Sequence, residues 1–302
     1  MTTRRPRPGA PDTRGLDPPG QPGARAGRQR GDPPKHGSDA GRIRIGVGGW
    51  TFAPWRKDFY PVGLVQRREL EYASRHLTAI EINGTFYRAQ KPATYARWRD
   101  ETPEGFVFSA KAPMRIVQSR VLATTGAQVA DFLGAIASLG DRLGPIVWQF
   151  DTGPTLDRKD FATFLELLPG DIDGRRLRHV LDVRDPAFVD ADYLALARSH
   201  GMATVFTDSS AHPSFVDLTA DFVYARLMRS RSEVAAGYEA SDLDAWARRA
   251  RQWAAGGEPD DLPRLASAAA AARPRDVFLY FISGAKARNP AAALALIGRL
   301  LD

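Results

Sequence analysis

The chain has 302 residues, which suits one large domain, such as an α/β barrel of about 250 residues, or two small ones. Hydrophobic residues make up 43% of it and charged residues 25%, an ordinary balance for a globular protein. The absence of cysteine excludes disulfides, thiolate metal sites, iron–sulfur clusters and cysteine nucleophiles. No stretch reaches the roughly 18 consecutive apolar residues of a membrane helix, and the amino terminus lacks the apolar core of a secretory signal. We therefore expect a cytoplasmic protein with no membrane partner.

The net charge of +7 is concentrated at the amino terminus. Residues 1–41 carry eight basic and four acidic side chains, a net +4, and the remaining 261 residues carry only +3. Sixteen of these 41 positions are Gly or Pro and none is aromatic, so the segment cannot bury enough apolar surface to offset its chain entropy. We expect a disordered tail, which is either a solvated extension or a basic arm for a polyanion such as nucleic acid.

From residue 42 onward, short β-type runs alternate with helical patterns, which is typical of parallel βα units. The expected strands are 43–48, 78–83, 106–111, 145–150, 178–184, 203–208, 222–227 and 276–282. The expected helices are about 65–76, 92–100, 127–139, 158–168, 190–200, 241–254 and 290–301. Eight strands with helical returns predict a TIM (β/α)8 barrel, with an open doubly wound sheet as the alternative.

Two segments depart from the regular repeat. Only SSAHPSFVDLTA separates the sixth and seventh expected strands, so one barrel helix is reduced or missing. Residues 255–275 combine a Gly/Pro/Asp turn with an alanine run, and we expect an insertion outside the core. The predicted organisation is a tail over 1–41 and one barrel domain over 42–302.

Near the ends of several expected strands, polar side chains occupy alternate positions, so that those of one strand share a face. Side chains two apart share a face of a strand, and this pairs Glu81 with Asn83, Ser109 with Lys111, Gln149 with Asp151, Asp182 with Arg184, and Tyr224 with Arg226. The side chains at the other positions are mostly apolar. If the apolar set of side chains packs on the outer helices, the polar set points into the barrel. It then lies near the carboxyl ends of the strands, where barrel enzymes hold their active sites.

These positions carry charges of both signs, so two interpretations stay open. Buried charges must be paired, because isolated burial costs several kcal/mol, and the set can therefore be a salt-bridge network that closes the barrel. Alternatively it is a ligand site, in which Arg184, Arg226 and Lys111 hold a small phosphorylated or carboxylated ligand while Glu81 or Asp182 moves protons. We expect Lys111 to stay protonated beside two carboxylates.

Further contacts to such a ligand are expected from six side chains: Asn83, Gln149, Asp208 and Tyr224, with Trp50 and Tyr87 as stacking rings or as lids. No cofactor and no metal ion is expected, because none of the five histidines falls at a strand tip with ligand spacing. A magnesium site made only of the carboxylates of Glu81, Asp182 and Asp208 stays an alternative.

Several short motifs follow one another in a specific order and spacing. They are Gly48-Gly49-Trp50 with Trp55 and Phe59-Tyr60-Pro61; Glu81-Ile82-Asn83 with Thr85-Phe86-Tyr87; Trp98, Thr102-Pro103 and Phe106 to Lys111 with Pro113; then Leu143-Gly144, Gln149-Phe150, Asp182 to Arg184, Phe222 to Arg226 and Tyr280-Phe281. Together they resemble the YecE-like family, also called domain of unknown function 72, over about residues 43–301. The resemblance implies a TIM barrel with a polar central pocket and no settled reaction.

The chain departs from what this resemblance implies at three strand ends. Met228-Arg229 follows Leu227 where the family usually has His-Gly, Asp182-Val183-Arg184 replaces Glu-Phe-Arg, and Ile282-Ser283 replaces an asparagine pair. The missing histidine removes the most natural general base, so we expect a family activity to be altered or lost here. Two hypotheses follow: a pocket for a small anionic ligand with acid/base chemistry, or a non-catalytic barrel that binds nucleic acid or an anion with help from the tail.

Overall fold

Eight parallel strands close into a barrel in the order β1-β10-β9-β8-β7-β4-β3-β2. This computed structural model describes residues 40–152, 156–266 and 272–301, so the tail expected over 1–41 lies almost entirely outside the described residues. The strands are β1 Ile43–Gly48, β2 Ala79–Ile82, β3 Val107–Lys111, β4 Leu143–Phe150, β7 His179–Val183, β8 Ala203–Thr207, β9 Phe222–Leu227 and β10 Asp276–Phe281. All eight expected strands are present, which confirms the predicted TIM barrel. No helix among the described residues is long and apolar enough to cross a membrane.

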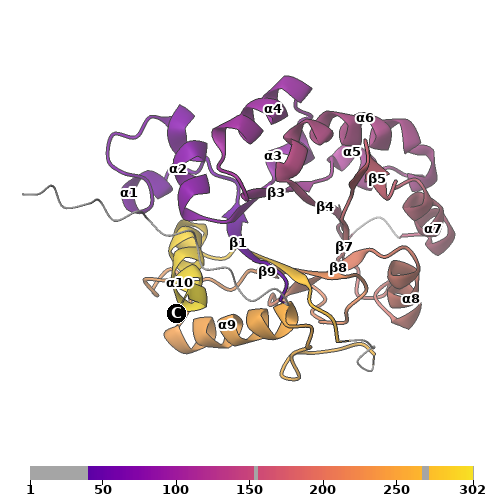
Figure 1. The fold of residues 1–302 in the computed structure, drawn as a ribbon. Coiled ribbons are helices and arrows are strands. Elements are labelled where there is room, and N and C mark those ends of the chain that lie inside the picture. The colour runs from indigo at the N-terminus through magenta and orange to yellow at the C-terminus, as the bar shows by residue number, and fades with distance from the viewer. Residues whose placement is uncertain (1–39, 153–155, 267–271, 302) are drawn as a thin grey trace, which may run out of the picture. The chain divides into compact units, whose positions relative to one another are not determined.

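Helices surround the barrel (Figure 1). They are α1 Trp55–Asp58, α2 Glu69–His76, α3 Gly84–Tyr87, α4 Pro92–Glu101, α5 Met114–Val117, α6 Gly126–Ile136, α7 Arg158–Glu166, α8 Ala191–Ser199, α9 Ala240–Ala254 and α10 Asn289–Leu301, with 3-10 turns η1 Gln66–Arg68, η2 Leu122–Thr124, η3 Ala137–Arg142 and η4 Lys286–Arg288. The seven expected helices are found within a few residues of their predicted ends. The one-turn helices α1, α3 and α5 were not predicted, because four residues are too few to show a helical period.

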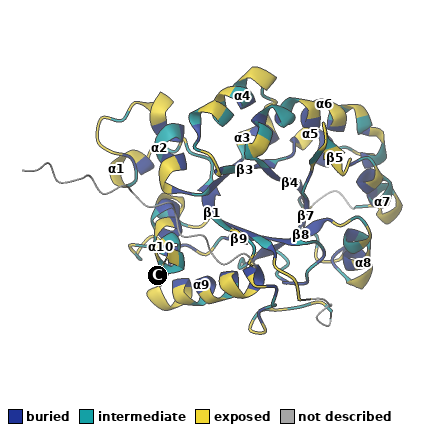
Figure 2. Ribbon diagram, viewed as in Figure 1, coloured by how far each residue is buried: buried dark blue, intermediate teal, exposed yellow. Residues whose placement is uncertain are grey.

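Burial explains why the longer helices form where they do. Each presents an apolar stripe to the barrel and a polar face to solvent, while the strands are buried on both sides (Figure 2). Helices α7 and α8 also begin at side-chain caps: the carboxylate of Asp157 accepts from the Asp160 N–H at 2.8 Å, and that of Asp190 from the Tyr193 N–H at 2.9 Å.

The link between β8 and β9, residues 208–221, contains no helix, as predicted. Its apolar residues Phe215 and Val216 are buried against the barrel instead. The Asp217 carboxylate accepts from the N–H groups of Leu265 at 2.7 Å and Ala266 at 2.9 Å, which ties the described part of the expected insertion to the link. This irregular layer therefore covers the strands where a helix is missing.

A short hairpin was not predicted. Strands β5 Asp171–Ile172 and β6 Arg175–Arg176 pair antiparallel across Asp173 and Gly174. Both turn residues have positive φ, 51° and 72°, which is the Asp-Gly chemistry of a tight hairpin turn. Two-residue strands carry too little alternation to be seen in the sequence.

Gly46 sets how closely β1 approaches β2. It pairs with Ala79, and a Cβ at position 46 would lie 2.1 Å from the Ala79 carbonyl oxygen. We predict that Gly46→Ala lowers the free energy of unfolding by about 1–3 kcal/mol, because the strands must separate. Urea denaturation measures this change.

Gly134→Ala in α6 is the matched control, since a Cβ there meets no heavy atom within 4 Å. It should be neutral or stabilising by about 0.5–1 kcal/mol, because alanine favours a helix. Equal midpoints for the two variants would show that the close approach at Gly46 does not limit the barrel.

Candidate functional site

The inward-facing side chains change character along the barrel axis. An apolar cluster fills the interior: Ala79, Val147, Val180, Ala203, Val205, Phe222, Tyr224, Phe278 and Tyr280. Two residues further along the same faces come polar or charged side chains, including Glu81, Gln149, Asp182, Thr207 and Arg226. We call the carboxyl ends of the strands the mouth of the barrel. The mouth is thus polar, and the interior below it is apolar.

Arg226 lies at the centre of a buried ion-pair network. Its Nε and Nη2 donate to the two oxygens of Glu81 at 3.0 and 2.9 Å, and its Nη1 donates to Asp182 at 2.5 Å and to Gln149 at 3.0 Å. The Tyr224 hydroxyl also donates to Glu81, at 2.5 Å. Glu81 is fully buried and Arg226 is only 2% exposed, so these charges depend on one another rather than on water.

A second arginine extends the network toward solvent. Arg184 donates to Asp182 at 3.3 Å, to Asp151 at 3.1 Å and to Gln149 at 3.0 Å, and Gln149 donates to Asp151 at 2.7 Å. We call the set Glu81, Gln149, Asp151, Asp182, Arg184, Tyr224 and Arg226 the barrel network. Its members come from strands β2, β4, β7 and β9 or their ends, and the structure brings these together, whereas Asn83, Ser109 and Lys111 lie outside the barrel network.

Electrostatics in the barrel network follow from burial and pairing. Burial alone would lower the pKa of Arg226, but Glu81 and Asp182 raise that pKa above its usual value. Burial, and next the charge of Glu81, raises the pKa of Tyr224 well above its usual value. Arg226 therefore stays charged and Tyr224 stays a neutral donor.

Lys111 lies beside this network but outside it. Its ammonium is half-buried and sits 3.7 Å from the centre of the Phe86 ring, and it makes no ion pair or hydrogen bond to a described residue. Burial lowers its pKa to about 8, helped by Arg226 and opposed by Glu81 and Asp151. Lys111 therefore stays mostly protonated at neutral pH, but its pKa is lowered and not raised, because desolvation outweighs the nearby carboxylates.

Four of the residues expected at a ligand site lie elsewhere. Trp50 packs on the helix side of the sheet, edge-on to Trp98 at 4.9 Å between ring centres. Tyr87 is 79% exposed, and its ring contacts Phe86.

Asp208 accepts from the Met228 N–H at 2.5 Å and the Tyr238 hydroxyl at 2.8 Å, so it anchors the loop after β9. Asn83 follows β2, and its side chain lies against Gly48. The amide of Asn83 has no hydrogen-bond partner among the described residues.

His212 is a site candidate that the sequence did not indicate. It lies in the helix-less link after β8, within electrostatic range of Arg184, Asp182, Asp151 and Arg226. Burial, and next the charge of Arg184, lowers its pKa. Nothing in the local pattern could have placed it there, because an irregular link has no period from which to infer a direction.

The structure does not gather metal ligands at the mouth. Among the described residues, no group of three or more His, Asp or Glu side chains converges as a metal site requires. In the magnesium alternative, Glu81 and Asp182 already accept from Arg226, and Asp208 makes its bonds outside the barrel network. The residues present thus do not form the expected three-carboxylate set.

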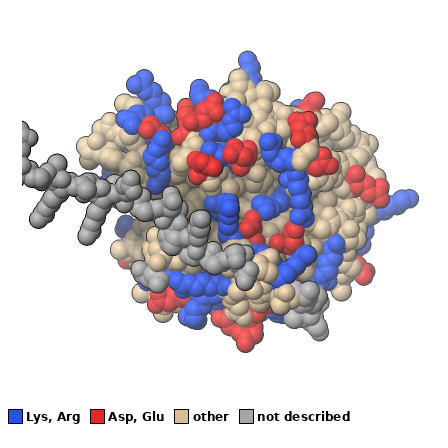
Figure 3. Space-filling model, viewed as in Figure 1, with Lys and Arg blue, Asp and Glu red and all other residues tan. Residues whose placement is uncertain are grey.

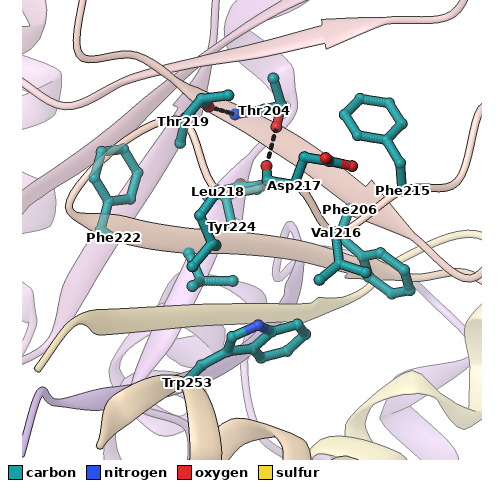
Figure 4. Close-up of a pocket in the computed structure, with 12 residues that line it drawn as sticks. Thr204, Phe206, Phe215, Val216, Asp217, Leu218, Thr219, Phe222, Tyr224 and Trp253 are labelled. Carbon is teal, nitrogen blue, oxygen red and sulfur yellow. Dashed lines mark hydrogen bonds between the residues drawn. The ribbon is translucent and has the colours of Figure 1, made fainter. Parts of the chain in front are cut away.

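A small cavity lies under the helix-less link (Figure 4). It is lined by Thr204, Asp217, Thr219 and Trp253 among others and measures about 10 Å³, the size of a single water molecule. Thr204 closes one side, donating from its N–H to Thr219 at 3.0 Å and from its hydroxyl to the Asp217 carbonyl at 3.2 Å. It is too small for an organic ligand.

Comparison with known proteins agrees with this architecture. Residues 44–302 match the family model "Protein of unknown function DUF72". The chain is 30% identical to UPF0759 protein YecE of Escherichia coli K12 over 148 residues, 48% of this chain and 50% of that protein, and 33% identical to UPF0759 protein YunF of Bacillus subtilis over 70 residues, 23% and 24% of the two chains. The matched region thus spans about half the length of YecE.

Solved structures show the same fold. A DUF72 family protein from Thermotoga maritima superposes with a TM-score of 0.67 at 18% identity, covering 86% of this chain and all of that one. Another from Enterococcus faecalis gives 0.59 at 15% identity, covering 85% and 97%. The match of the family model from β1 to the end of α10 shows that this chain belongs to the DUF72 family of uncharacterised TIM-barrel proteins.

Proposed function

We propose that the barrel mouth binds a small anionic ligand, phosphorylated or carboxylated, with Lys111 as its main contact. The observation that carries this proposal is the half-buried ammonium of Lys111, which has only the Phe86 ring as a partner among the described residues. A cation removed from water without an anion is unfavourable, and a ligand oxygen would supply what is missing.

The barrel network cannot supply that oxygen in its present arrangement. Glu81 accepts three hydrogen bonds from Arg226 and Tyr224, and Asp182 accepts from both Arg226 and Arg184. The barrel network is therefore a scaffold that closes the barrel, which favours the salt-bridge interpretation for its inner members. Arg184, 17% exposed, is the group left to assist Lys111.

Acid/base catalysis is the finer part of the proposal. A pKa of about 8 allows Lys111 to give up and regain a proton near neutral pH, as a general acid or base requires. His212 would be the second proton carrier, since it faces the same charges from the opposite loop.

We predict that Lys111→Met abolishes stabilisation by the anion that binds the mouth. The full-length protein is screened by thermal shift against phosphorylated sugars, nucleotides, small carboxylates and short single-stranded DNA. A ligand that raises the melting temperature of the parent should bind at least about 10-fold more weakly to Lys111→Met, the loss of one charge-assisted hydrogen bond. Because the pKa of free Lys111 is about 8, binding should also decline as the pH rises through 8.

Lys286→Met is the matched control. Lys286 also lies over an aromatic ring, 4.6 Å from the centre of Phe52, and burial alone lowers its pKa, with no contribution from the charges of the mouth. Equal loss of binding in both variants would contradict the mouth as the site. If only single-stranded DNA raises the melting temperature, and does so equally in the parent and in Lys111→Met, the nucleic-acid-binding alternative is favoured instead.

A further inference from the structure

A large groove runs between α2 and α4 on the outside of the barrel, and none of its lining residues belongs to the barrel network. It has a volume of about 920 Å³, within the range of small-molecule sites. We call it the α2–α4 groove; it is lined by Trp50, Thr51, Gln66, Arg67, Arg68, Leu70, Glu71, Arg75, Arg97, Trp98, Asp100 and Glu101. Basic and acidic side chains gather over these two helices (Figure 3).

The floor of the groove is aromatic. Trp50 and Trp98 meet edge to face at 4.9 Å, and both also contact Phe108 on β3. Each indole is only partly buried. Neither indole N–H has a hydrogen-bond partner within the described chain, so both are available as donors.

The carboxylates of the groove are already occupied. Glu71 accepts from Arg68 at 2.8 Å and lies 3.9 Å from Arg75. Glu101 lies 3.6 Å from Arg97, and Asp100 accepts from Arg99 at 2.8 Å.

Arg67 differs from the other arginines of the groove. It is exposed on η1 at the rim, and its guanidinium has no ion pair or hydrogen bond to any described residue.

Apart from Thr51 and Gln66, whose side chains can donate or accept, and the unbonded carboxylate oxygens of Asp100 and Glu101, which lie beside arginines, the free polar groups of the α2–α4 groove are donors. The two indole N–H groups, Arg67 and the remaining N–H groups of Arg75 and Arg97 all require acceptors. A suitable ligand has a flat apolar part for the indoles and an anionic part rich in acceptor oxygens for the arginines.

We propose that the α2–α4 groove binds a nucleoside phosphate, with its base stacked on one indole of the perpendicular Trp50–Trp98 pair and its phosphate toward Arg67. Phosphate oxygens are acceptors only, and every nucleobase presents an aromatic face that stacks on indole. The same chemistry is offered by a free nucleotide and by a nucleotide unit of a single strand. This site is independent of the mouth and of Lys111.

Binding to the full-length protein is measured by calorimetry with four probes: adenosine monophosphate, adenosine, ribose 5-phosphate and a short single-stranded oligodeoxyadenylate. Adenosine monophosphate should bind at least about 10-fold more tightly than adenosine or ribose 5-phosphate, since each of these lacks one half of the recognised group. Arg67→Glu should weaken the binding of adenosine monophosphate at least about 10-fold.

Arg248→Glu on α9 is the matched control, because Arg248 is an exposed helical arginine on another side of the barrel that forms no ion pair with a described residue. Arg248→Glu should bind adenosine monophosphate as the parent does, and Lys111→Met reports separately on binding at the mouth. If the oligonucleotide binds more tightly than the mononucleotide and Arg67→Glu abolishes this binding, the natural ligand is a nucleic-acid strand. If the mononucleotide binds more tightly, the natural ligand is a free nucleotide.

Three results would overturn the proposal. They are no binding of any probe, ribose 5-phosphate binding as tightly as adenosine monophosphate, and an equal loss in Arg67→Glu and Arg248→Glu. A loss in Lys111→Met with none in Arg67→Glu would move the nucleotide to the mouth, which rejects this groove while supporting the function proposed above.

Discussion

Arg226→Met is expected to lower the free energy of unfolding by about 3–5 kcal/mol, the typical cost of breaking a buried ion pair from one side. Methionine approximates the volume of the arginine stem but provides no donor. It would leave Glu81, which is fully buried, with only the Tyr224 hydroxyl, and would also strip one partner from Asp182. Urea denaturation of parent and variant measures the difference.

A double variant separates the lost pairing from lost packing. Glu81→Gln removes the charge that Arg226→Met leaves stranded, so the double variant should be more stable than Arg226→Met alone. If Glu81→Gln gives no recovery, the loss comes from packing around position 226. A change below about 1 kcal/mol in Arg226→Met would mean that the barrel network does not hold the barrel closed.

His179 is expected to make the fold sensitive to acid. It is 5% exposed at the start of β7, where its Nδ1 accepts from the Trp148 indole at 3.0 Å and its Nε2 donates to the Pro169 carbonyl at 2.8 Å. This arrangement needs the neutral ring. Burial lowers the pKa of His179 from 6.5 to about 4, only partly opposed by the bond to Pro169.

The sign of the pH effect follows from this lowered pKa. Between pH 4 and 6.5 the unfolded chain binds a proton that folded His179 does not, so stability falls as the pH falls through that range. The contribution is complete above about pH 6.5 and amounts to roughly 3 kcal/mol. Urea denaturation at a series of pH values measures it.

His179→Asn isolates this effect from other titrating groups. Its amide oxygen can still accept from Trp148, but the side chain does not titrate, so its stability should change less between pH 6.5 and 4 than that of the parent. The half-buried Asp208 has a raised pKa and acts in the opposite direction, and it is common to both proteins. His76→Asn at an exposed helix end should follow the parent. Parallel curves for the parent and His179→Asn would show that His179 is not the acid-sensitive group.

The barrel network changes how the polar mouth is understood. Glu81 was expected to be a proton carrier, but its oxygens are held by Arg226 and Tyr224 in the dry interior. Chemistry at the mouth is more reasonably sought at Lys111 and His212, whose polar atoms are not held by the barrel network. The alternation of side chains along the strands pointed to the inner residues, because it does not show which polar groups are already paired.

Local pattern was enough to determine the strands, the longer helices and the side chains that share the barrel interior. A strand has a period of two, so Glu81, Asp182 and Arg226 could be assigned to one face although they are up to 145 residues apart. The missing helix after β8 was also visible, because only a short link separates the two strands. These are properties of neighbouring residues, which a sequence displays directly.

Pairing and exposure were decided only by the closed barrel. Which arginine holds which carboxylate depends on the register between strands, and Lys111 has no carboxylate partner among the described residues because Glu81 and Asp182 are held by Arg226. Trp50 and His212 follow strand ends, where the chain path and not the strand period sets direction, so one turned outward to Trp98 and the other toward the mouth. Such contacts join distant segments and depend on their positions in space, which no local period encodes.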